Sequence, residues 1–216
     1  MIHLRLALRT LIHYRMYSII NMAGMAISLA CAIIIARYVH SELTVDGFNT
    51  KLDRIYRVRT EQFNKDEGLI NINPDKDKSL VDLSGNPGVE KHASFRYSGN
   101  GQIAVNNQTY GAGLLSIDTV FLQILDYPVI AGVNNIRRPE DVLITEAFAA
   151  KIFGSEDPLG KTFDYLAVRK TLTIAGIIRT PAYKSILSFD MLVSSQLPGR
   201  WAGGGAGPQN LILLYP

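Results

Sequence analysis

The longest apolar segment of the sequence lies near the amino terminus. Residues 19–36 read "IINMAGMAISLACAIIIA" and contain no charged side chain. A helix of about 20 such residues crosses the hydrocarbon core of a bilayer, which is roughly 30 Å thick. The segment therefore predicts a transmembrane helix over residues 18–40, with a buried core helix as the alternative. Small side chains that would suit contact with another membrane helix recur along it: Ala23, Gly24, Ala26, Ser28 and Ala30.

The residues before this span have an amphipathic pattern. In "IHLRLALRTLIHYR" (2–15), apolar side chains recur on one helical face and arginines follow on a neighbouring face, with Leu4, Leu8, Leu11 and Ile12 beside Arg5 and Arg9. This pattern predicts a helix over residues 1–17 that lies in the cytoplasmic membrane interface. A plain basic flank that only orients the span is the alternative.

Beyond the span, short segments with strand-like alternation are mixed with short helical patterns. In chain order we expect a strand (53–63), a short helix (78–83), a hairpin turning at Asn106 and Asn107 (103–118), a helix capped by Asp118 (118–125), a strand (141–146), a helix (147–153), a strand (170–181) and a loop (200–210). This mixture predicts an α+β extracytoplasmic domain over residues 41–216, preceded by the amphipathic helix and the transmembrane helix.

The distribution of charge sets the expected orientation. The whole net charge of +3 is in the first eighteen residues, which hold Arg5, Arg9 and Arg15 and no acidic side chain. By the positive-inside rule the amino terminus stays in the cytoplasm, and everything after about residue 40 is exported. The charge balance of the remainder argues against nucleic acid as a partner, because binding phosphates requires a surplus of Lys and Arg.

A cleaved signal peptide would also begin with a basic and then an apolar segment. Its apolar region would be shorter, at about 7 to 15 residues, and a small-x-small cleavage site would follow. Here "RYVHSELTVD" follows the apolar run, so we favour an uncleaved anchor. The single cysteine, Cys31, lies within the span, so the exported domain has no internal disulfide.

The segment "FGSEDPLGKTF" (153–163) ends in Gly-Lys-Thr, which also closes an ATP-binding P-loop. The P-loop has four residues between its glycines, whereas five separate Gly154 from Gly160. A P-loop also joins a strand to a helix, but here a helix is expected first, then Gly154 as a left-handed C-cap, a turn at Asp157 and Pro158, and a strand after Gly160. We therefore expect a structural turn and no nucleotide at Lys161 and Thr162.

Other enzyme signatures are weak. The histidines His3, His13, His40 and His92 are scattered, and no Cys/His cluster offers metal ligands at workable spacing. Adjacent acids at 66–67 and 156–157 are interpreted as solvated loop charges, and Trp201 as a partly buried aromatic. The sequence thus predicts a protein that is not an enzyme, with no catalytic, cofactor-binding or metal-binding residues and no cofactor.

Several motifs together resemble the MacB/FtsX-like ABC transporter permeases, especially the Bacteroidetes type. The acidic "E-L-x-x-D-x-F" segment of that family matches Glu42, Leu43, Asp46 and Phe48, and its "RIYRV" strand matches residues 54–58. The recurring "F-G-x-x-D-P-[IL]-G-K" turn matches residues 153–161. Further segments, "SIDTVFLQILDYPVIAG" and "LTIAGIIRTPAYKSILSFDMLVS", resemble its extracytoplasmic core domain.

The resemblance implies a non-catalytic permease subunit in a bacterial inner membrane, with its exported domain in the periplasm. It implies a separate cytoplasmic ABC ATPase, a homodimer or pseudo-dimer, contact with membrane lipid, and a periplasmic adaptor or outer-membrane channel as a further partner. ATP-driven movement of the membrane helices would be passed to the exported domain. Such permeases continue into further membrane helices, so the chain is interpreted as a fragment that ends before them.

Two other functions are alternatives for this sequence. A single-span anchored module, complete as written, would use its exported domain to bind or sense a ligand. A nucleotide-dependent enzyme that uses Gly160, Lys161 and Thr162 disagrees with the spacing, the order of elements and the compartment.

Overall fold

The computed structural model divides the chain into two compact units, Met1–Val45 and Asp46–Pro216. The residues that it describes are 13–58, 61–64, 68–72, 83, 85–179, 184–197 and 208–216. Most of the expected interfacial helix and of the expected short helix at 78–83 lies outside the described residues, so both stay predictions.

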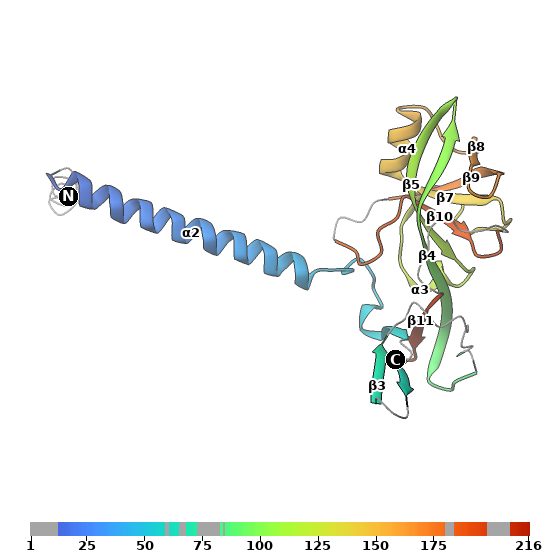
Figure 1. Cartoon of the computed structure of the whole chain (residues 1–216), viewed down its shortest axis with the longest axis horizontal. Helices are drawn as coiled ribbons and strands as arrows, with labels where there is room; N and C mark the ends of the chain where they lie inside the picture. Colours follow the sequence, from blue (N-terminus) through green and yellow to red (C-terminus); the bar gives the residue numbers. More distant parts are fainter. Residues whose placement is uncertain are drawn as a thin grey trace. The chain divides into compact units, whose positions relative to one another are not determined.

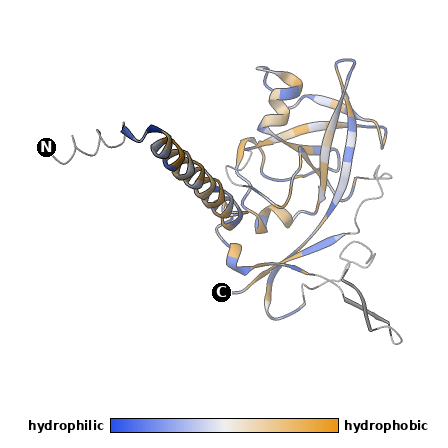
Figure 2. Ribbon diagram, turned by 60° about the vertical axis from the view of Figure 1, so that its left-hand side comes forward, coloured by the Kyte–Doolittle hydropathy of each residue, from blue (hydrophilic) through white to orange (hydrophobic). Residues whose placement is uncertain are grey.

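The described part of the first unit is dominated by one long helix, α2 (Arg15–Leu43), of 29 residues (Figure 1). None of its residues is buried, and its most apolar stretch has a mean hydropathy of 2.3. Figure 2 shows apolar residues along most of its length. At about 1.5 Å per residue the helix is about 44 Å long, which exceeds the hydrocarbon core of a bilayer. The predicted span at 18–40 lies wholly within α2.

The second unit is built mainly of strands. In chain order it contains a 3₁₀ turn η1 (Leu52–Arg54), β1 (Ile55–Val58), β2 (Glu61–Asn64), β3 (Gly68–Ile72), β4 (Val89–Val105), β5 (Gln108–Ile117), α3 (Phe121–Ile124), β6 (Val129–Gly132), β7 (Asp141–Thr145), α4 (Glu146–Phe153), β8 (Thr162–Tyr165), β9 (Lys170–Ile178), β10 (Met191–Ser194) and β11 (Gln209–Leu214). The mixture of strands and short helices agrees with the α+β prediction.

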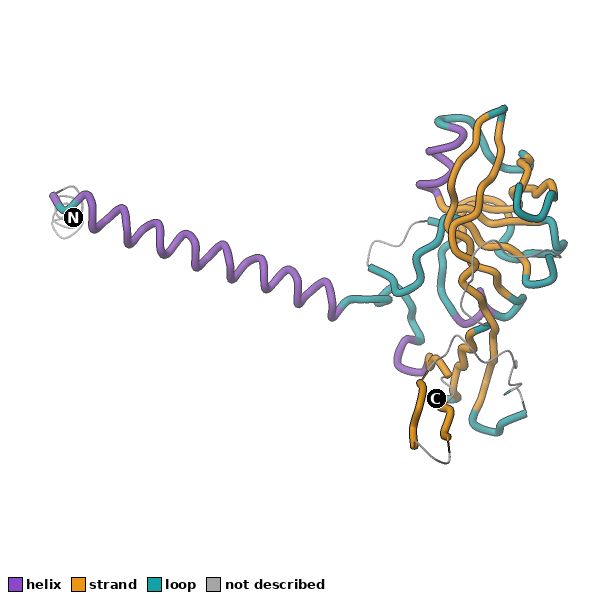
Figure 3. The backbone as a smooth tube through the Cα atoms, viewed as in Figure 1, coloured by secondary structure: helices purple, strands orange, loops and turns teal. Residues whose placement is uncertain are grey.

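Six strands of the main sheet close into a ring (Figure 3). Around the ring the order is β4, β5, β10, β7, β9 and β8, and β8 pairs back with β4 through Tyr165 opposite Ile103. Two strands, β11 and β1, continue the sheet from the amino-terminal part of β4, whereas β6 extends it beside β9. The remaining two, β2 and β3, form a separate two-stranded sheet.

Two hydrophobic cores lie on opposite faces of these strands. Along β7 the side chains alternate, so that Val142 and Ile144 join the first core and Leu143 joins the second. The first core is the interior of the ring, and α4 packs on it with Phe148, Ala149, Ile152 and Phe153. The second core is covered by α3 through Phe121 and Ile124. Both faces of β7 are therefore buried.

Several predicted elements are confirmed. The hairpin turns at Asn106 and Asn107, whose φ angles of 46° and 62° suit the tight turns that join antiparallel strands. The helix predicted at 147–153 is α4, which begins after Thr145, whose hydroxyl accepts a hydrogen bond from the Phe148 N–H. The strands predicted at 141–146 and 170–181 are β7 and β9.

Three boundaries were wrong. The strand predicted at 53–63 is divided, because β1 pairs with β11 while β2 pairs with β3, and strand partners depend on long-range contacts more than on local alternation. The helix predicted at 118–125 is only α3, although Asp118 accepts hydrogen bonds from the N–H groups of Val120 and Phe121, as expected of a capping residue.

The third error concerns the loop predicted at 200–210. Residues 200–207 lie outside the described part of the chain, but Gln209 and Asn210 begin β11. This strand lies between β1 and β4 and buries Leu211 and Leu213, so the apolar run near the end of the sequence forms part of the second core.

Candidate functional site

The Gly-Lys-Thr sequence lies in a turn that leads from α4 to β8. Gly154 ends the helix with a φ of 63°, as expected, but its ψ of −118° is outside the left-handed helical region. The Asp157 carboxylate accepts a hydrogen bond from the Leu159 N–H at 3.0 Å and forms the expected turn. The order is helix, turn and strand, which is the reverse of a P-loop.

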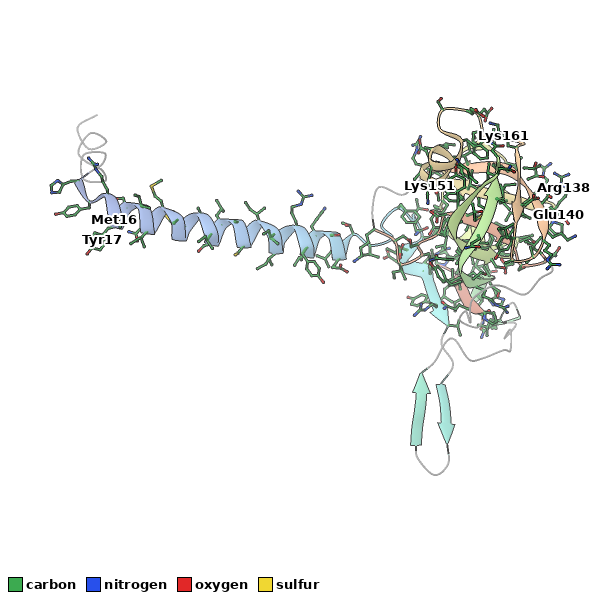
Figure 4. The ribbon with its side chains drawn as sticks, turned by 45° about the horizontal axis from the view of Figure 1, so that its top comes forward. Met16, Tyr17, Arg138, Glu140, Lys151 and Lys161 are labelled. Atoms are coloured by element: carbon green, nitrogen blue, oxygen red, sulfur yellow. The ribbon has the colours of Figure 1, made fainter. Side chains whose placement is uncertain are left out.

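The polar groups of this turn are already engaged. The Gly160 N–H donates to the Ile174 carbonyl oxygen at 2.9 Å, and the Lys161 N–H donates to that of Pro158 at 3.1 Å. The Lys161 ammonium forms an ion pair with Glu156 and lies 4.9 Å from the centre of the Phe153 ring. Lys161 is labelled in Figure 4. The hydrogen bond and charge of Lys161 lower the pKa of Glu156. The N–H groups and the lysine that a P-loop uses to bind phosphate are therefore bonded within the domain, as expected for a structural turn.

Metal chemistry has no candidate site in the described part of the chain, where no group of three or more His, Cys, Asp or Glu side chains could hold an ion. His92 Nε2 lies 3.0 Å from Asn210 Oδ1 across two neighbouring strands. Trp201 and the acids at 66–67 lie outside the described residues. The absence of catalytic and cofactor-binding residues stays a prediction.

The segment that follows α2 is bound to distant parts of the second unit. We name residues 46–50 the connector; only Thr44 and Val45 separate it from α2 in the sequence. The Asp46 N–H donates to the Lys184 carbonyl oxygen at 2.9 Å. The Asp46 carboxylate accepts a hydrogen bond from the Ile186 N–H at 3.3 Å, across 140 residues of chain. The connector thus contacts the loop that precedes β10.

Asn49 is the centre of the connector. Its side chain is 95% buried, because only 5% of the residue is exposed. Asn49 Nδ2 donates to the Asp46 carbonyl oxygen at 3.1 Å, and Asn49 Oδ1 accepts from the Asp126 N–H at 2.8 Å. An amide side chain supplies both the donor and the acceptor that this position requires. Asn49 therefore fixes the connector's own turn and joins it to the loop after α3.

Thr50 makes a second link to the same loop. Its N–H and its hydroxyl both donate to the Asp126 Oδ2, at 2.8 and 2.6 Å. A hydrogen bond to a charged acceptor is stronger than one between neutral groups. Asp126 therefore contacts the connector through its backbone and its side chain.

An aromatic cluster lies under these hydrogen bonds. The Phe48 and Tyr127 ring centres are 5.0 Å apart, and Phe189 meets Tyr127 edge to face at 5.2 Å. Tyr127 is only 4% exposed, and its hydroxyl lies 3.4 Å from Ser185 Oγ. Burial raises the pKa of Tyr127 to about 12; the charge of Asp46 also raises it, whereas the bond to Ser185 lowers it.

A groove opens beside the connector, with a cavity volume of about 320 Å³. We name it the connector groove. Asp46 and Arg57 supply charged groups to its lining, and Ile186 stands at it with 71% of its surface exposed. Most of the remaining lining is apolar: Leu52, Ile55, Phe95, Leu125, Leu187 and Leu211.

The sequence identified part of this site. Asp46 and Phe48 belong to the matched "E-L-x-x-D-x-F" segment, and both lie in the connector. Asp126 and Tyr127 lie in the matched segment "SIDTVFLQILDYPVIAG", but nothing in it distinguishes them as site residues. Asn49 is outside the matched positions, although an asparagine after a glycine-containing turn is a local sign of backbone capping. Their long-range partners have no sequence signal in one chain.

The family model described as the MacB-like periplasmic core domain matches residues 18–205. Three solved structures have a similar fold. A domain of a putative permease protein from Porphyromonas gingivalis has a TM-score of 0.65 at 23% identity, covering 78% of this chain and 76% of that one.

The other two are more distant in sequence. The periplasmic region of MacB from Actinobacillus actinomycetemcomitans gives a TM-score of 0.53 at 15% identity, covering 74% of this chain and 73% of its own. The extracellular domain of the noncanonic ABC-type transporter YknZ from Gram-positive bacteria has a TM-score of 0.55 at 14% identity, and the match covers 75% of this chain and 84% of that one. No curated protein sequence matches the chain.

Proposed function

The chain belongs to the MacB-like periplasmic core domain family, and we propose from this membership that it is a non-catalytic permease component of an ABC transporter. In this proposal α2 spans the inner membrane and the second unit lies in the periplasm. The exposed apolar surface of α2 and the arginines near its amino end support this orientation.

We propose further that the connector passes movement of α2 to the periplasmic domain. The observation that carries this proposal is the set of hydrogen bonds around Asn49, which join the segment directly after α2 to residues 77 positions away. Any movement of α2 that is transmitted along the backbone to the second unit must pass through Asp46. Because Asp46 and Thr50 are bonded to the loops before β10 and after α3, the displacement would reach the sheet and not be lost in a flexible linker.

The family membership is also the basis for the partners that we propose. A cytoplasmic ABC ATPase subunit would drive the movement, and the permease would act as a homodimer or pseudo-dimer. The amino-terminal segment would contact membrane lipid or the ATPase. A periplasmic adaptor or outer-membrane channel is proposed as a further partner.

The test is hydrogen exchange on the protein purified with its partners from its native membrane. Bound backbone N–H groups at Asp46, Thr50, Asp126 and Ile186 report directly on the connector. We expect their exchange to differ between the nucleotide-free and the ATP-bound complex. The turn between β8 and β9, at residues 166–169, is the internal control and should not respond.

Two results would contradict the proposal. If an ABC ATPase is not recovered with the chain, the single-span binding or sensor module becomes the working function. If an ATPase is recovered but exchange at the connector does not depend on nucleotide, the chain is a transporter component whose movement takes another route.

A further inference from the structure

The connector groove combines a mostly apolar lining with one cationic side chain, Arg57. Pockets of about 300–1,000 Å³ with mostly apolar walls and a few polar groups are typical ligand sites, and this groove is within that range at about 320 Å³. Arg57 lines it; its guanidinium donates to Gln209 Oε1 at 3.5 Å and forms no ion pair in the described part of the chain. The other charged group of the lining, the Asp46 carboxylate, is bonded to the Ile186 N–H. The occupant that fits this combination has an apolar tail and an anionic head.

The position of the groove along the chain indicates where such an occupant would come from. Asp46, which lines the groove, is three residues beyond Leu43, the last residue of α2. Three residues span at most about 11 Å. A helix of about 44 Å matches the full thickness of a bilayer with its headgroups, so its ends reach the headgroup regions. Asp46, at the groove, is therefore within about 11 Å of the headgroup region.

Ile186 gives a second reason. It is 71% exposed, and its backbone N–H is bonded to the Asp46 carboxylate, so the loop that carries it is fixed beside the connector. Leu52, on the 3₁₀ turn after the connector, is also exposed at 41%. Two aliphatic side chains held at an apolar groove would lose water-exposed area if a hydrocarbon chain lay between them.

We propose that the connector groove binds one acyl chain of an anionic phospholipid from the periplasmic leaflet of the membrane. The acyl chain lies against Leu52, Ile186 and Leu211, and the phosphate lies near Arg57. The lipid would then bind the segment through which α2 moves the domain. This inference rests on the proposed membrane span of α2.

The test uses the full chain in nanodiscs that contain a phospholipid with a photoreactive diazirine in one acyl chain. After illumination and digestion, mass spectrometry locates the lipid adducts. We expect adducts on α2 and on peptides from residues 46–57 and 184–187. Adducts on α2 alone would overturn the groove proposal but leave the span intact, whereas a lack of adducts on α2 would overturn the span as well.

Matched variants identify the groove as the site. Ile186→Asp should reduce adducts in the groove about tenfold, because it replaces apolar contact with a charge. Ile130→Asp is the control, since Ile130 is also an exposed isoleucine, at 39%, but lies on β6 at the other edge of the sheet from β1. Equal adduct loss in both variants would contradict the proposal.

The headgroup is tested with Arg57→Gln. In anionic nanodiscs this change should reduce groove adducts about fivefold, as expected for one cationic side chain at a membrane surface, and in zwitterionic nanodiscs the reduction should be smaller. A photoreactive amino acid at position 186 tests other occupants. A lipid adduct supports the proposal, whereas cross-linking to a second copy or to another protein overturns it.

Discussion

The connector and the Gly-Lys-Thr turn are both short polar segments that match recurring motifs, yet their contacts differ in reach. In the turn the side-chain contacts are local: Lys161 pairs with Glu156 five residues away, and Asp157 bonds an N–H two residues away. The backbone bond from Gly160 to Ile174 reaches only the adjacent strand β9. In the connector, Thr50 bonds Asp126 across 76 residues and Asp46 bonds Ile186 across 140. A turn of the first kind shapes its own backbone. A segment of the second kind holds separate parts of the domain together, which suits transmission of movement.

The largest expected effect comes from removal of the central side chain of the connector. Asn49→Ala leaves the Asp126 N–H without its acceptor and removes the Asn49 Nδ2 bond to the Asp46 carbonyl oxygen, which keeps only the bond from the Asn49 backbone N–H. The free energy of unfolding of the second unit should therefore fall by about 2–3 kcal/mol. Thermal and denaturant unfolding of the full chain in detergent would measure the change. Asn135→Ala, at an exposed asparagine, is the matched control and should differ little from the native sequence. Equal stability of the two variants would contradict the role of Asn49.

Tyr127 predicts a pH dependence specific to the connector. Its pKa is raised from 10.0 to about 12 by burial, so the folded protein keeps the phenol proton at pH values where the unfolded chain releases it. The resulting stability is fully present below pH 10 and is lost as the pH rises through 12. Two pKa units correspond to about 2.8 kcal/mol in total, of which about 2 kcal/mol is lost between pH 10 and pH 12.

Tyr127→Phe separates this titration from those of the other tyrosines and the lysines, which occur in both proteins. The unfolding free energy of the variant, relative to that of the native chain, should rise between pH 10 and pH 12. Parallel pH profiles for the two proteins would show that the Tyr127 hydroxyl is not buried in the folded state.

The comparison is sharpened by removal of one carboxylate from each segment. Asp126→Ala removes the acceptor of both Thr50 hydrogen bonds and should cost about 1 kcal/mol, although the Asp126 N–H can still bond Asn49. Asp157→Ala removes a single local bond in the turn and should cost less. The two melting temperatures, measured side by side, test the order. A larger drop in melting temperature for Asp157→Ala than for Asp126→Ala would contradict the conclusion that the connector, and not the turn, holds separate parts of the domain together.

The sequence predicted the local parts of this fold well, for physical reasons. The turn at Asn106 and Asn107 and the helix predicted at 147–153 depend on residues within a few positions of each other. The apolar run of α2 was found because its length alone matches a bilayer. Each of these patterns can be recognised from one segment of the sequence, without knowledge of its partners in the fold.

The connector could be predicted only in part because its contacts are long-range. The resemblance pointed to Asp46 and Phe48, but their partners lie in two loops that sequence spacing does not relate to them. The same limit applies to β11, whose place between β1 and β4 depends on pairing across most of the domain. In both cases the residue types were visible in the sequence and their partners were not.

The smallest expected effect is that of Lys161→Ala. The Lys161 and Glu156 side chains are 35% and 71% exposed, and ion pairs at the surface contribute little, so the melting temperature should change by about 2 °C or less. The same variant tests nucleotide binding, because a P-loop depends on its lysine. Calorimetric titration of the full chain with Mg-ATP should give no saturable heat for either protein. Saturable binding that Lys161→Ala abolishes would mean that the turn can open into a phosphate site, although its N–H groups are bonded within the domain.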